Sequence, residues 1–114
     1  MPAAARLGDQ ETGTCNPGLP CCPHSRTGTN SEVSSNVLIN RLGAHRKNDT
    51  GPCNCPHGGT FKTTGGSGTV FINGRAAVRI GDSTTCNDCG QSGSHRTGSP
   101  NVIIGGEAWA FYPM

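Results

Sequence analysis

Charged and aromatic side chains are scarce in this chain: 14% of its 114 residues are Asp, Glu, Lys or Arg, and 4% are aromatic. Only 32% of the residues are hydrophobic, which excludes a thick apolar core. No apolar run is long enough to span a membrane. The formal charge of +2 comes without a basic run, which argues against a nucleic-acid-binding surface. We therefore expect one small domain that needs support from a metal, from disulfides or from oligomeric contacts.

The amino-terminal segment has neither the basic start nor the apolar centre of a secretory signal. We therefore expect assembly in the cytoplasm, where structural disulfides are rare. The chain has 7 cysteines, an odd number that excludes complete internal pairing. Compartment and count together favour metal binding, with a disulfide framework as the alternative.

Glycine and cysteine are plentiful, and they mark an internal repeat. Residues 34–49 and 67–82 match at a constant offset of 33 residues, and the triplet Cys-Pro-His recurs at the same offset, at 22–24 and 55–57. A third copy is split, because residues 98–106 repeat the front half and residues 3–9 repeat the back half. The chain thus begins and ends inside a repeat unit.

Each copy has the pattern of a β-hairpin. Asn73-Gly74 joins two apolar-alternating segments, which is the strongest short hairpin signal. Residues 36–46 predict the same hairpin with a degraded turn, because the glycine has moved to Gly43. Pairing the N-terminal strand with the C-terminal strand would close a ring and remove open edges. The sequence thus predicts an all-β fold: a small pseudo-threefold cone of three β-hairpins, one formed by joining the N- and C-terminal strands, with a metal stapling the apex.

A glycine- and proline-rich loop with cysteine or histidine follows each hairpin. In a threefold arrangement these loops converge at one end of the axis, where their ligands suit zinc, with iron as the alternative. We assign the metal site to His24, Cys55, His57 and Cys86. Competing ligands are Cys22, Cys53 and Cys89, the roles of Cys15 and Cys21 stay open, and several of the cysteines are expected to be small buried apolar groups.

Other polar residues have simpler interpretations. His45 aligns with Val78 inside a strand and is expected on a strand face rather than at a metal. His95 is a minor candidate ligand. The repeated carboxylates and the arginines before them indicate turn chemistry rather than acid catalysis. These residues are Asp9, Asp49 and Asp82, with Arg6, Arg46 and Arg79.

The segments MPAAARLGD, VFINGRAAVRIGD and GSPNVIIGG resemble the repeats of the PAAR family, named for its Pro-Ala-Ala-Arg motif. The resemblance covers residues 1–106, a spike-tip domain, and leaves 107–114 as a short aromatic tail. It implies a cone with a metal, held by His24, His57 and Cys86, near its apex. Such a cone caps and sharpens the trimeric membrane-piercing spike of a contractile injection machine, either a type VI secretion system or a contractile phage tail.

The resemblance also implies partners. One copy would dock on a trimeric spike protein, VgrG-like or from a phage tail, and would touch the target membrane transiently at the tip of the particle. The aromatic tail would either cover the core or contact the spike. We expect no enzymatic activity and no nucleic-acid partner. The alternative function is a small metal- or thiol-dependent catalyst, but Cys86 and Cys89 lack the βαβ context of a redox motif.

Overall fold

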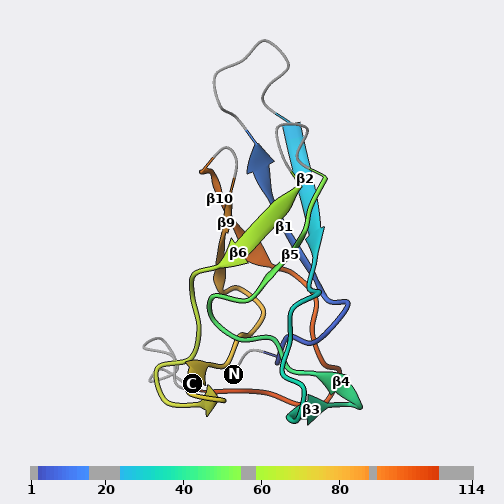
Figure 1. Cartoon of the computed structure of the whole chain (residues 1–114), viewed down its shortest axis with the longest axis vertical. Coiled ribbons are helices and arrows are strands. Elements are labelled where there is room, and N and C mark those ends of the chain that lie inside the picture. Colours follow the sequence, from blue (N-terminus) through green and yellow to red (C-terminus); the bar gives the residue numbers. More distant parts are fainter. Residues whose placement is uncertain (1–2, 16–23, 55–58, 88–89, 106–114) are drawn as a thin grey trace.

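The computed structural model of the chain describes residues 3–15, 24–54, 59–87 and 90–105, which form strands and turns without a helix. Within these ranges there is accordingly no helix that could cross a membrane. Figure 1 shows short hairpins at a broad lower end and longer strands running toward a narrower upper end. The predicted all-β fold is confirmed. The strands are β1 (Gln10–Cys15), β2 (His24–Thr29), β3 (Leu38–Ile39), β4 (Leu42–Gly43), β5 (Thr50–Pro52), β6 (Thr60–Thr63), β7 (Phe71–Ile72), β8 (Arg75–Ala76), β9 (Ser83–Cys86) and β10 (Ser92–His95).

The predicted hairpins form the broad end, which we call the base. Strands β3 and β4 pair with each other, as do β7 and β8. Asn73 and Gly74 both have positive φ (54° and 79°), as a type I′ turn requires. Asn40 and Arg41 adopt the same conformation at 53° and 70°. The expected degraded turn is therefore wrong: the first hairpin keeps the turn type, with an arginine in the place of glycine.

The third hairpin joins the two ends of the described chain, as predicted. Ala3 bridges Ile103 in antiparallel fashion, and the Ala4 amide donates to the Val102 carbonyl at 2.9 Å. This pairing joins residues 3–4 to residues 102–103. The three hairpins therefore form a continuous ring.

A closed cycle of main-chain hydrogen bonds lies directly above the hairpins. The Ala5 amide donates to the Val78 carbonyl (2.9 Å), the Val78 amide to the His45 carbonyl (3.3 Å), and the His45 amide to the Ala5 carbonyl (3.1 Å). These three residues occupy the same position in the three repeats. Each inner strand therefore pairs with both others, and none of the three has a free edge. We call this feature the Ala5–His45–Val78 ring.

Each inner strand ends in a turn with the pattern Arg-x-x-Asp, which we call the Arg–Asp turn (6–9, 46–49 and 79–82). In every copy the aspartate amide donates to the arginine carbonyl at 3.0–3.1 Å, and the carboxylate accepts two guanidinium hydrogen bonds at 2.7–3.1 Å. The carboxylates thus serve turn chemistry, as predicted. The third turn residue has positive φ in all three copies, which favours glycine or asparagine. These residues are Gly8, Asn48 and Gly81.

Above the turns stands a six-stranded antiparallel sheet in the order β2-β1-β10-β9-β6-β5. An isolated bridge between Gly28 and Cys53 links the two outer strands. Asn54 strengthens this closure, because its amide donates to the Thr27 carbonyl at 3.2 Å and its side-chain oxygen accepts from the Thr27 amide at 2.7 Å. The sheet therefore wraps into a nearly closed cone, which confirms the predicted shape.

The apolar core is small and repeats with the hairpins. Its buried members are one alanine and one isoleucine from each hairpin, with Val37 and Val102 packed against them. The alanines have no exposed surface and the isoleucines are 7% exposed. Above this layer the buried side chains are mostly polar, as the low hydrophobic content requires. The core residues are Ala4, Ala44, Ala77, Ile39, Ile72 and Ile104.

The three Arg–Asp turns should contribute different amounts to the free energy of unfolding, although their hydrogen bonds are alike. Asp49 has no exposed side chain and contacts a second guanidinium, that of Arg75, at 2.9 Å, whereas the side chain of Asp9 is 8% exposed. Hydrogen bonds to charged groups contribute roughly 1.5–3 kcal/mol each. We therefore expect Asp49→Asn to lower the free energy of unfolding by more than Asp9→Asn, as measured by chemical denaturation. Equal losses would contradict this assignment.

Candidate functional site

Two of the predicted metal ligands, His24 and Cys86, lie on strands at the narrow end of the cone, which we call the apex. Strands β1, β5 and β9 end here and β2, β6 and β10 begin here, because neighbouring strands are antiparallel. The strand ends on either side of the three predicted ligand loops therefore share one end of the sheet. His24 begins β2 opposite Cys15, and Cys86 ends β9. Cys55 and His57 lie outside the described residues, as do Cys21, Cys22 and Cys89.

Repeated asparagine contacts hold the bases of these loops together. Asn87 donates from its amide to the Thr60 carbonyl (3.1 Å) and from its side chain to the Thr60 hydroxyl (3.0 Å). Asn54 and Thr27 form the corresponding contact one repeat earlier. We call these two contacts, Asn54–Thr27 and Asn87–Thr60, the asparagine clamps. Each clamp holds the start of one loop against a strand of the neighbouring repeat.

The structure describes the side chains of two cysteines near the apex, Cys86 and Cys53. Cys86 is fully buried, and its amide donates to the Gln91 carbonyl at 3.0 Å. Cys53 is half-buried, and its amide closes the neighbouring loop on the Gly59 carbonyl at 2.8 Å. Thiol and imidazole donors at the mouths of such loops are the chemistry that zinc prefers. Among the described residues alone, no group of three or more His, Cys, Asp or Glu side chains could hold a metal ion.

A chain of buried hydrogen bonds fills the middle of the cone. The two ring nitrogens of His45 lie 2.8 Å from the Glu32 carbonyl and 2.8 Å from the Thr63 hydroxyl. His95 Nε2 lies 2.9 Å from the same hydroxyl. Both imidazoles are fully buried, with ring centroids 5.2 Å apart, and Phe61 packs against both. His45 is therefore an interior strand residue rather than an exposed one.

The geometry determines which nitrogens carry protons when both imidazoles are neutral. A carbonyl oxygen can only accept, so His45 Nδ1 donates to Glu32 and His45 Nε2 is an acceptor. The Thr63 hydroxyl then donates to His45, and it must accept from His95 Nε2. His95 Nδ1 is left as a bare acceptor, and it has no hydrogen-bond partner in the described structure.

Burial lowers the pKa of both histidines strongly. The pKa of His45 falls to about 4, mainly because an imidazolium would lose its hydration in the interior. The pKa of His95 falls to about 3 for the same reason, and the nearby charge of His45 lowers it further. Both imidazoles are thus neutral at physiological pH and belong to the interior packing.

An ion pair that the sequence did not indicate lies beside this chain. Arg26 Nη2 is 3.0 Å from Glu11 Oε1, and neither side chain is exposed. The Thr84 hydroxyl donates to the same carboxylate oxygen at 2.6 Å. Gly28 leaves the space for it, because a Cβ there would lie 2.5 Å from Glu11 Oε2 and 2.6 Å from the Phe61 ring. These residues have no counterparts in the other repeats, so no repeated signal marked them.

The base presents a second candidate site, formed by exposed apolar side chains. Leu38, Phe71 and Ile103 are 60%, 60% and 57% exposed. Each one precedes the buried isoleucine of its hairpin, so the three occupy equivalent positions around the pseudo-threefold axis. We call them the base triad. Exposed apolar groups in a symmetric set are typical of a surface that meets another protein.

A comparison with protein families identifies the fold. The family model described as the PAAR motif matches residues 22–92 and, in a second overlapping match, residues 56–112. The two matches start 34 residues apart, close to the internal repeat. The chain therefore belongs to the PAAR-motif family, which confirms the resemblance seen in the sequence. This membership supports a structural spike-tip role in contractile injection systems in general. A comparison with curated proteins gave no match.

The buried histidines should make stability depend on pH. Between the pKa of an unfolded histidine, 6.5, and the folded values of about 4 and about 3, the unfolded chain binds more protons than the native state. The free energy of unfolding should therefore decrease as the pH decreases. Between pH 7 and pH 5 each histidine should lower it by about 2 kcal/mol.

Chemical denaturation at pH 7 and pH 5 measures this loss. His45→Val introduces the residue that the copy at 67–82 carries at the same position, Val78, and it should remove about half of the pH dependence. Identical pH dependence in the parent and in this variant would show that other groups cause it.

Proposed function

We propose that the protein is the tip that caps and sharpens a trimeric membrane-piercing spike of a contractile injection machine. The observation that carries this proposal is the base triad, because Leu38, Phe71 and Ile103 present the same kind of exposed apolar contact three times around one axis. A single chain can meet three identical subunits in similar ways only if it is itself pseudo-symmetric. One copy per trimer follows from this matching.

The partner fits a symmetric β-structured trimer, VgrG-like or from a phage tail. The base consists of two-stranded hairpins in which β3 and β7 each pair with a single strand, so it can extend the strands of a partner below it. Polar turn residues surround the base triad, and an apolar centre with a polar rim is the usual anatomy of a protein interface. We also propose that the chain assembles on the spike in the cytoplasm. Its apex would then contact the target membrane transiently.

At the apex we propose a zinc ion, with iron as the alternative, held by His24, Cys55, His57 and Cys86. Two observations support it: the strands bring the three loops to one end, and asparagine clamps fix two of the loop bases. The donor set suits zinc. The ion would supply cross-linking where the cone is too narrow for a core, and such a closed site contributes folding free energy directly.

Docking can be tested with charge placed in the base triad. Phe71→Asp should weaken binding to the cognate trimeric spike protein by at least about 30-fold, because a buried anchor of this kind contributes about 2 kcal/mol or more. Ile80→Asp is the matched control, since Ile80 is also exposed (36%) but lies in an Arg–Asp turn outside the base hairpins.

Native mass spectrometry of the mixture should show one copy of the chain per spike trimer. Three copies per trimer, or equal binding by both variants, would count against the tip and would revive the alternative of a metal- or thiol-dependent catalyst.

Metal content tests the apex. We expect about one zinc or iron per chain after purification without chelators, because a closed tetrahedral site binds one ion. His24→Ala and His57→Ala should release the ion and lower the melting temperature. His45→Val should also lower stability but keep the ion, which separates loss of a ligand from general destabilisation. Metal-free parent protein, or full metal content in both apex variants, would refute the assignment by elemental analysis.

A further inference from the structure

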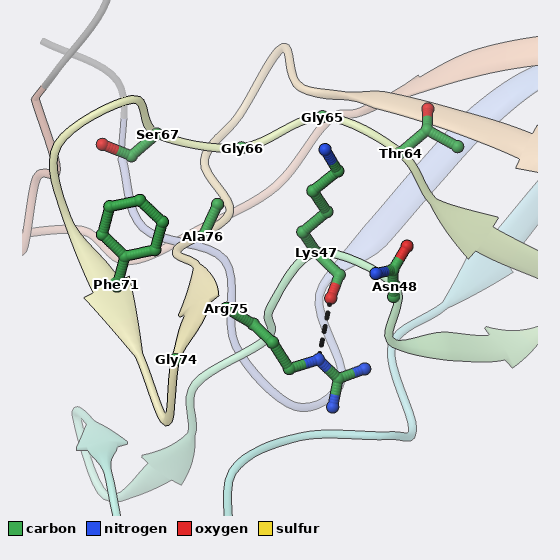
Figure 2. A pocket seen from close by; sticks show the side chains of 10 residues that line it. All are labelled: Lys47, Asn48, Thr64, Gly65, Gly66, Ser67, Phe71, Gly74, Arg75 and Ala76. Carbon is green, nitrogen blue, oxygen red and sulfur yellow. Dashed lines mark hydrogen bonds between the residues drawn. The ribbon is translucent and has the colours of Figure 1, made fainter.

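One flank of the base contains a pocket of 520 Å³. It lies between the β7–β8 hairpin and the segment 64–67, and Figure 2 shows Phe71 on one side and Lys47 reaching toward Gly65 on the other. Its walls thus combine an aromatic ring, a cation and main chain. The lining residues are Lys47, Asn48, Thr64, Gly65, Gly66, Ser67, Phe71, Gly74, Arg75 and Ala76.

The pocket is positively charged. It is lined by two cations and by no acidic side chain of the described residues. Arg75 is held in place, because its Nε donates to the Lys47 carbonyl at 3.0 Å and its Nη2 lies 2.9 Å from Asp49. That carboxylate also binds Arg46, so it offsets only part of the charge. Glu32 acts on both arginines from further away and accepts hydrogen bonds from Thr50.

The charge is found on one flank of the pseudo-threefold base. Lys47 is the second residue of its Arg–Asp turn, and the equivalent residues of the other two turns are Leu7 and Ile80. The pocket therefore does not serve a contact that is repeated three times, and a ligand that is present once per chain suits it better.

The described chain ends at the rim of this pocket. The Gly105 carbonyl accepts hydrogen bonds from the Ser67 hydroxyl (2.8 Å) and from Arg79 Nη1 (2.9 Å). Ser67 lines the pocket. The next residues, 106–114, lie outside the described residues and carry one acidic side chain, Glu107, with three aromatic ones. Glu107 is the second residue after Gly105 in the sequence.

We propose that the pocket binds the chain's own segment 106–114, with Glu107 facing Lys47 and an aromatic side chain against Phe71. Charge complementarity favours this occupant, and so does its attachment at the rim, because a short tether gives an effective concentration on the order of millimolar. The binding needs no second protein. Phe71 also belongs to the base triad, so the segment and the proposed spike would contact the same ring. The experiment below uses the chain without the spike, so its result is distinguishable from the result of the docking test.

Trp109 is the only tryptophan of the chain, so its fluorescence reports on the segment directly. In the isolated full chain we expect Trp109 to be protected from acrylamide quenching. Lys47→Glu and Glu107→Lys should each raise the exposed fraction by about two- to fivefold, the range expected for one exposed ion pair. The double variant, Lys47→Glu with Glu107→Lys, should restore protection, and high salt should weaken the effect of the single changes.

Arg41→Glu is the matched control, because it places the same negative charge on the β3–β4 hairpin, where this pocket does not extend. It should leave the quenching unchanged. Equal quenching in the parent and in Lys47→Glu, or no restoration in the double variant, would overturn the proposal. Protection of Trp109 that appears only after the spike trimer is added would also overturn it and would assign the segment to the docking interface.

Discussion

The closed ring of hydrogen bonds among Ala5, His45 and Val78 is the constraint on which the rest of the fold depends. It pairs each inner strand with both others, so three strands satisfy one another without a fourth. The Arg–Asp turns then leave the ring in three equivalent directions, and each arginine also donates to the next hairpin, at Asn40, Asn73 or the Gly105 carbonyl. A chain with few apolar residues thus obtains order from polar contacts that are repeated within and between the three copies.

The threefold repeat determines the shape of the cone. Positions where the three copies differ introduce the polar side chains of its interior. At the level of the ring, the position held by alanine and valine in two repeats is a histidine in the third, and Thr63 links it to His95. Higher up, Glu11 and Arg26 fill space that Gly28 leaves open. These substitutions make the interior polar, and a polar interior of fixed hydrogen bonds resists deformation only while its groups keep their protonation state.

Much of the fold could be predicted, because the repeat leaves a signal in every copy. Asn73-Gly74, the split third hairpin and the Arg–Asp turns follow from local sequence, and the structure confirms them. The turn at Asn40-Arg41 departs from the prediction, because it keeps its type although an arginine stands in the place of glycine. Glu11 and Arg26 gave no signal either, since they meet only through strand register. For the metal site, the sequence predicts ligand types, and the structure places His24 and Cys86 on strands at the apex.

The base and the apex of the cone are stabilised in different ways, although both are built from the same repeat. At the base the hairpins spread, so three buried isoleucines can form a core and leave one apolar side chain per hairpin exposed. Toward the apex the buried side chains are mostly polar, so apolar burial contributes less to holding the loops together. Hydrogen-bonded asparagines take over this role at the loop bases. Beyond them, ligand-type residues are concentrated in the loops, where the proposed metal would supply the cross-links.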